Sequence, residues 1–154
     1  MGYFCLKCGE IYKENIKNTQ IQYNKNNNIE DWIFCPKLKC IGQVIEVDDM
    51  FLPIIRLLNN KGYYTEHCCS GHVGTDTYDS YISFDKTIQG LLLIPEGYIE
   101  EKDNNKYCIR RNYSDKLNDI DFHLELLNNA IETLNWAKEL KNIKPLQLEK
   151  LIST

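Results

Sequence analysis

Hydrophobic residues recur most regularly between residues 114 and 142, at spacings of three and four positions. This period predicts a long amphipathic helix that is capped by Ser114 or Asp119 and that ends before Pro145, which cannot continue it. We expect the apolar stripe of this helix to cover a sheet. The stripe comprises Ile120, Leu124, Leu127, Ile131, Leu134 and Ala137.

A second, shorter helix is predicted after residue 47. Asp48 and Asp49 are candidates for its N-cap, because a carboxylate accepts hydrogen bonds from the free N–H groups of a first helical turn. Pro53 falls in that first turn, where its missing N–H costs nothing, and Gly62 suits the left-handed position that follows a helix. The apolar face expected to be buried comprises Met50, Pro53, Ile54, Leu57 and Leu58.

Short apolar or alternating runs between and before these helices predict β-strands separated by turn residues. They occupy residues 43–47, 63–67, 80–85, 90–95 and 105–113. Several strands with only two helices indicate an α+β domain, in which an antiparallel or mixed sheet is covered by the two helices. Residues 48–145 are assigned to this domain, and residues 146–154 to a C-terminal tail.

The first 47 residues contain two pairs of cysteines, each followed closely by a glycine and preceded by a strand-forming run. Such pairs supply the four thiolates of a tetrahedral zinc site. The expected metal ligands are Cys5, Cys8, Cys35 and Cys40. Because four cysteines leave no open position on the ion, this zinc is predicted to be structural. Residues 1–47 are therefore expected to form a zinc ribbon, with residues 13–30 as an irregular insertion.

Composition and charge limit the partners and the cellular location that the sequence predicts. The 154 residues carry a formal net charge of −4, which argues against unspecific binding to a nucleic-acid backbone. Seven cysteines cannot all pair in disulfides, so reduced, metal-binding cysteines and a cytoplasmic location are predicted. No apolar run approaches the roughly 20 residues that cross a bilayer, so no membrane partner is expected.

The run YYTEHCCSGHVG, residues 63–74, gathers reactive side chains around a Ser-Gly turn. The donors for a second metal there would be His67, Cys68, Cys69 and His72. As a second hypothesis, Cys69 beside His72 has the elements of a cysteine nucleophile and its base. As a third, the backbone of Ser70 and Gly71 forms a nest of N–H groups for an anion, assisted by His72. The sequence leaves these three hypotheses open.

The segment IIRLLNNKGYYTEHCCSGHVG, followed by the strand YISF, resembles the signature region of the wybutosine-synthesis methyltransferases, which act on the tricyclic base of phenylalanine tRNA. In that family a helix and a strand lead into a Thr-Thr-Ser-Ser-Cys-Ser-Gly-Arg turn. Thr65, Cys69, Ser70 and Gly71 match that turn, and His72 stands where the family has arginine. The resemblance covers only the middle of the chain. It implies an α+β fold, a ligand cleft beside the turn and S-adenosylmethionine as cofactor.

A four-cysteine ribbon ahead of a CCSGH turn also resembles small bacterial and phage proteins, and this second resemblance implies no particular function. The leading functional hypothesis is a zinc-containing protein that binds an anionic, nucleotide-type ligand, either a small nucleotide signal or an RNA segment. Tyrosines near the turn would stack on a base, and an arginine would contact phosphate. The residues assigned to the ligand are Thr65, His67, Cys69, Ser70, Gly71, His72 and Arg110.

Two other classes of function stay open. One is an enzyme, either an RNA methyltransferase that uses S-adenosylmethionine or a hydrolase that uses Cys69 and His72 as its catalytic candidates. The other is an interaction module whose zinc is structural and whose turn binds nothing. Under each of these hypotheses, association with further copies of the chain stays open.

Overall fold

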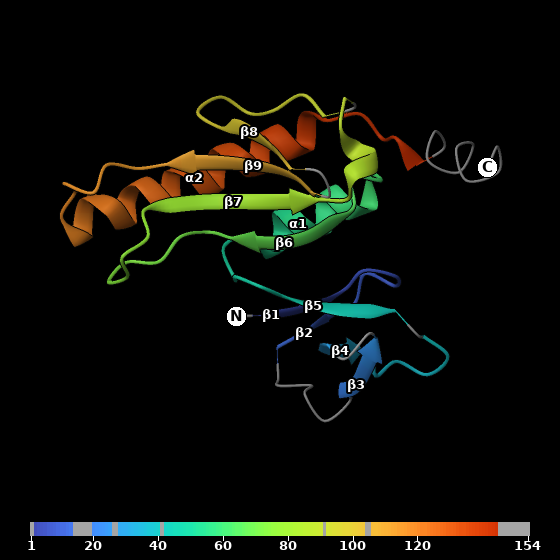
Figure 1. The fold of residues 1–154 in the computed structure, drawn as a ribbon. Helices are drawn as coiled ribbons and strands as arrows, with labels where there is room; N and C mark the ends of the chain where they lie inside the picture. The colour runs from blue at the N-terminus through green and yellow to red at the C-terminus, as the bar shows by residue number, and fades with distance from the viewer. Residues whose placement is uncertain are drawn as a thin grey trace.

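The computed structural model describes residues 2–13, 20–25, 28–40, 42–90, 92–103 and 106–144. These residues form two antiparallel sheets and two α-helices (Figure 1). The predicted α+β class is therefore confirmed, and the sheets are antiparallel rather than mixed. The tail predicted over residues 146–154 lies outside the described residues.

The N-terminal sheet carries the paired cysteines in and beside its strands. Its strand order is β2-β1-β5-β4-β3, and neighbouring strands pair in antiparallel fashion. The strands are β1 (Gly2–Cys5), β2 (Ile11–Tyr12), β3 (Gln20–Lys25), β4 (Asn28–Phe34) and β5 (Gln43–Val47).

The hairpin of β3 and β4 shows that the irregular insertion expected over residues 13–30 is wrong for residues 20–25 and 28–30, whereas residues 14–19, 26 and 27 lie outside the described residues. The run from Gln20 to Lys25 alternates polar residues with Ile21 and Tyr23, a strand pattern that is weak because its apolar positions are few. The pairing partner decides the outcome: β4 pairs with β3 along one edge and with β5 along the other.

The second sheet has the order β6-β7-β9-β8, and its neighbouring strands also run antiparallel. Its strands are β6 (Thr65–Cys69), β7 (Asp79–Phe84), β8 (Ile99–Asp103) and β9 (Lys106–Asn112). The helices α1 (Leu52–Asn60) and α2 (Asp119–Glu139) lie behind this sheet in Figure 1, and the N-terminal sheet lies beyond the β6 edge. One sheet face is therefore covered by helices, and the opposite face is not.

Alternation along β7 and β9 separates these two faces. Ile82, Phe84, Tyr107 and Ile109 are fully buried, and they pack with α1 residues in the main core. Their neighbours in the strands, such as Tyr81 and Arg110, lie on the opposite, open face of the sheet because successive strand side chains point to opposite sides.

Most of the predicted strands are confirmed, but one is absent and one strand was not predicted. The run 90–95 was expected to be a strand, but its described residues, 90 and 92–95, are irregular, and Leu93 is 78% exposed. Its carbonyl instead accepts a hydrogen bond of 2.7 Å from Trp136 Nε1. The edge strand β8 takes the place of the expected one, and its charged sequence IEEKD gave no strand signal.

The long helix is present, but its predicted apolar face is buried only at the C-terminal end, where Ala137 is fully buried and Leu134 packs against the core. The stripe expected to be buried is largely exposed, with Ile120 at 75%, Leu124 at 51% and Ile131 at 61%. The buried residues are Phe122, Leu126, Asn129, Thr133 and Ala137. Asn129 and Thr133 are buried because Tyr98 pairs with both: its hydroxyl lies 2.9 Å from Asn129 Nδ2 and 3.0 Å from Thr133 Oγ1. The N-cap is Asn118, whose Oδ1 accepts the N–H of Asp121 at 2.8 Å, rather than Ser114 or Asp119.

The shorter helix α1 also agrees with its prediction in part. Pro53 lies in the first turn, and Gly62 follows the helix with a φ of 96°, as expected. The N-cap prediction is wrong, because the cap residue is Phe51 and no side chain caps the helix. The side chain of Asp48 is instead engaged by the turn that follows β6. The buried residues of α1 are Ile54, Ile55, Leu58 and Asn59.

Candidate functional site

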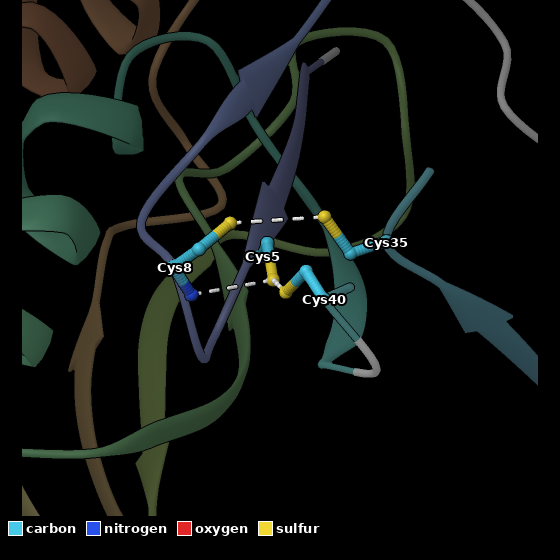
Figure 2. Close-up of side chains that lie close together, drawn as sticks. All are labelled: Cys5, Cys8, Cys35 and Cys40. Atoms are coloured by element: carbon cyan, nitrogen blue, oxygen red, sulfur yellow. Dashed lines mark hydrogen bonds between the residues drawn. The ribbon is translucent and has the colours of Figure 1, made fainter. Parts of the chain in front are cut away.

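The four predicted metal ligands lie together at one end of the N-terminal sheet, drawn in Figure 2. The sulfur atoms of Cys5 and Cys40 are 3.7 Å apart, as are those of Cys8 and Cys35, and all four lie within 4.8 Å of one another. Four bonds of about 2.3 Å to a tetrahedral ion place sulfur atoms about 3.8 Å apart, whereas a disulfide needs about 2.0 Å. These cysteines could therefore hold a metal ion.

The surroundings of these thiols suit thiolate ligands. The N–H of Cys8 points to Cys5 Sγ at 3.5 Å, and the hydroxyl of Tyr12 lies 3.0 Å from Cys35 Sγ. Burial opposes ionisation of Cys35, but hydrogen bonds from Tyr12 and from the backbone outweigh it and lower the pKa of this thiol to about 7. Gly42 is required here, because a Cβ at this position would lie 2.7 Å from Cys5 Sγ.

The Ser-Gly turn after β6 is built into the interior. Ser70 is 3% exposed, and both its N–H and its hydroxyl donate to Asp48 Oδ2, at 2.8 and 3.1 Å. The hydroxyl of Ser80 donates to the carbonyl of Ser70 at 2.7 Å. Gly71 has a φ of 95°, and a Cβ there would lie 2.5 Å from Leu126 Cδ2. The N–H of Ser70 that the anion hypothesis reserved for an external ligand is thus already bonded to the chain's own carboxylate.

The structure distributes the predicted ligand residues over three places. Thr65 is buried and hydrogen-bonds Asn59 at 2.9 Å, so its side chain faces the interior, as Ser70 and Gly71 do. Cys69 and His72 lie beside Asp48, a residue that the sequence proposed as a helix cap and not as part of a site. His67 and Arg110 come together on the open face of the second sheet.

That open face contains a hollow of about 360 Å³ above β6, β7, β9 and β8. The side chains around it are His67, Tyr81, Ser83, Glu101, Lys102, Lys106, Cys108 and Arg110. A second hollow of about 340 Å³ adjoins it, shares His67 and Tyr81, and is walled on its other side by residues of β4 and β5. The two sheets therefore border one continuous recessed surface.

The first hollow is lined by several cations, two of which are paired with carboxylates of the chain. Arg110 lies over the ring of Tyr81, 4.8 Å from its centroid, and is held there by Glu101 at 3.0 Å and by Asp79. Lys102 and Lys106 lie at the β8–β9 end, and Lys102 is paired with Glu100 at 3.3 Å. Arg111, which the sequence placed beside Arg110, points to the other face and donates to Glu132 at 3.0 Å.

No protein-family model, curated protein or solved structure matches the chain. The resemblance to the wybutosine-synthesis methyltransferases, with its S-adenosylmethionine cofactor, therefore stays a prediction. Among the described residues, no helix is both long and apolar enough to span a membrane.

Proposed function

We propose that this chain is a zinc-containing protein that binds an anionic, nucleotide-type ligand on the open face of its second sheet. The observation that supports the proposal is the hollow itself. An aromatic ring, a guanidinium, two ammonium groups and an imidazole line about 360 Å³ of space on a chain of net charge −4. Cations beside an aromatic ring are typical of a site for an anion; here Arg110 and Lys102 are paired with the chain's own carboxylates, so a ligand would compete for these two and meet Lys106 directly.

The lining groups match the parts of a nucleotide. A base stacks on a tyrosine ring or on a guanidinium plane, and Tyr81 and Arg110 offer both as a preformed pair. Lys102 and Lys106 are suited to phosphate oxygens. Ser83 is 5% exposed, and its hydroxyl is the one buried side-chain polar atom of the described residues without a hydrogen-bond partner. Ser83 lines the hollow, so rotation of its side chain toward a bound ligand would give this hydroxyl a partner.

Zinc is the metal that suits four cysteine ligands best, and here it would be structural. Ile33, Val44 and Ile45 of the N-terminal sheet line the adjoining hollow opposite His67 and Tyr81. The ion would therefore stabilise the sheet that forms one wall of the binding surface. Reduced thiolates also fit the predicted cytoplasmic location.

We prefer binding over catalysis because the pKa of the candidate nucleophile, the Cys69 thiol, is raised. Burial raises the pKa of the Cys69 thiol; the N–H of Gly71 lowers it in part, and the nearby carboxylates of Asp48 and Asp79 raise it by smaller amounts. A catalytic cysteine needs a lowered pKa. Hydrolysis and methyl transfer stay alternatives that rest on the sequence alone.

The test is calorimetry on the full, zinc-loaded chain with two probes, a mixture of ribonucleotides and a short single-stranded RNA. Arg110→Gln should weaken binding about 10- to 100-fold, the effect of losing one hydrogen bond to a charged group, about 1.5–3 kcal/mol. Arg56→Gln removes the same charge from an exposed position on α1, on the other face of the sheet, and should leave binding unchanged.

Lys106→Gln gives a second measurement that does not disturb folding, because Lys106 is exposed. It should weaken binding and reduce its salt dependence, since one phosphate contact is lost. Binding of the ribonucleotides would identify a small nucleotide, and binding of the oligonucleotide alone would identify an RNA segment. If neither probe binds, or if Arg110→Gln and Arg56→Gln bind equally well, the proposal is wrong.

A further inference from the structure

Three side chains that carry metal-binding atoms converge beside the turn after β6. They are Asp48, which follows β5, Cys69 at the end of β6, and His72, three residues further on. One donor atom of each lies within 4.8 Å of the other two, and His72 Nε2 is 3.5 Å from Asp48 Oδ2. None of these three residues is one of the four cysteines of the ribbon.

The surrounding hydrogen bonds hold two of these donors in place. Asp48 receives two hydrogen bonds from Ser70, at 2.8 and 3.1 Å, so its carboxylate has a fixed orientation. The N–H of Gly71 points to Cys69 Sγ at 3.4 Å. Outer contacts of this kind orient the ligands of metal sites.

The turn also repeats the local geometry of the ribbon. In the ribbon, Cys5 and Cys8 are three residues apart, and a backbone N–H within that turn points back to the first sulfur at 3.5 Å. Cys69 and His72 have the same separation, with the N–H of Gly71 pointing back to Cys69. Two donors at this spacing on a tight turn are a common way to present ligands to zinc.

We propose that Asp48, Cys69 and His72 bind a divalent transition metal, zinc by the chemistry of the donors. Sulfur and imidazole nitrogen disfavour magnesium and calcium, which take oxygen ligands. Binding converts the Cys69 thiol to a thiolate and releases its proton to solvent. Three protein ligands leave one tetrahedral position for water, in contrast to the closed set of four cysteines.

This ligand set replaces the one that the sequence suggested. Cys68 packs against the main core, whereas Cys69 lies opposite Tyr81 in the strand register and therefore faces the open side of the sheet. Because the two side chains point to opposite faces, they do not reach one ion. Asp48 supplies the third donor instead. Asp48 also lines the hollow of about 340 Å³, so the ion would border the recessed surface between the two sheets. The site does not depend on the nucleotide proposal.

The experiment is metal analysis of the full chain, stripped of metal under reducing conditions, reloaded with Zn²⁺ and freed of excess ion. The wild type should retain two ions per chain, and His72→Ala should retain one. His72 is exposed, so this variant should fold normally, and His123→Ala, at an exposed position on α2, is the matched control that should retain two.

Cobalt replacement provides a second measurement on the same proteins. A ribbon site has four cobalt–thiolate bonds and the proposed site has one, so Cys69→Ser should remove one weaker component of the thiolate-to-cobalt absorption. Cys8→Ser should remove the stronger component and leave the weaker. One ion per wild-type chain, or two ions retained by His72→Ala, would overturn the proposal.

Discussion

Leu126→Ala and Leu124→Ala form a matched pair that tests which face of α2 is buried. The two leucines are two residues apart in the same helix, and the same atoms are removed in each variant. Leu126 is 2% exposed and Leu124 is 51% exposed. Leu126 packs on the turn after β6, since a Cβ at Gly71 would lie 2.5 Å from its Cδ2. Its truncation therefore opens a cavity between α2 and that turn.

The expected magnitudes differ several-fold. Truncation of a buried leucine to alanine costs about 2–5 kcal/mol, and we expect about 3 for Leu126. At Leu124 the loss should be at most about 0.5 kcal/mol, because few contacts are lost and alanine has the higher helix propensity. For a chain of this length 1 kcal/mol corresponds to about 2–4 °C, so Leu126→Ala should lower Tm by about 6–12 °C.

Urea denaturation of the zinc-loaded chain, followed by circular dichroism, measures both variants. Equal m values would show that a shift in midpoint reports stability and not a change in the unfolded state. An equal loss in the two variants, or a larger loss in Leu124→Ala, would refute the orientation of α2. It would instead support the apolar stripe that the sequence pattern favours.

Two further predictions concern the metal and the turn. Cys8→Ser should lose one zinc per chain and lower the hydrogen-exchange protection of the ribbon strands, while α1 and α2 keep their protection. The control Cys108→Ser lies outside the cluster and should change neither the zinc content nor the protection. Equal protection of the ribbon strands in the two variants would argue against a structural ion. Gly71→Ala should cost more stability than Gly74→Ala in urea denaturation. Both glycines have positive φ, but a Cβ at Gly71 lies 3.0 Å from the carbonyl of Asp79, whereas one at Gly74 meets nothing within 4 Å. Equal losses would show that backbone strain alone matters.

The sequence predicts the elements of this fold better than their orientation. Periodicity identifies α2 and several strands because a repeated spacing is a local property of the chain. The buried face of α2 depends on a partner far away in sequence, Tyr98, whose hydroxyl hydrogen-bonds Asn129 and Thr133. Polar residues that are satisfied in this way look like surface positions, so a pattern of apolar residues alone misplaces the buried face over most of the helix, although it is right at Leu134 and Ala137.

The candidate sites show the same limit. The four ribbon cysteines could be predicted because their spacing within each pair fixes the local geometry. His67 and Arg110 could be named individually, but only the pairing of β6 with β7 and of β7 with β9 brings them to one hollow. Ser83 carries no sequence signal at all. Its importance comes from being buried without a hydrogen-bond partner, which only the packed structure reveals.

Asp48 shows most clearly how one residue changes role between sequence and structure. Its position before a helix suggests an N-cap, and its backbone carbonyl does accept the N–H groups of Phe51 and Leu52 at the start of α1. This backbone contact leaves the carboxylate free to bond Ser70 instead. The same residue directly follows β5 of the ribbon, so it connects the N-terminal sheet, the first helix and the turn after β6. A metal ion at Asp48, Cys69 and His72 would therefore bind the end of β5 to the end of β6, and would stabilise the boundary between the two sheets where the recessed surface lies.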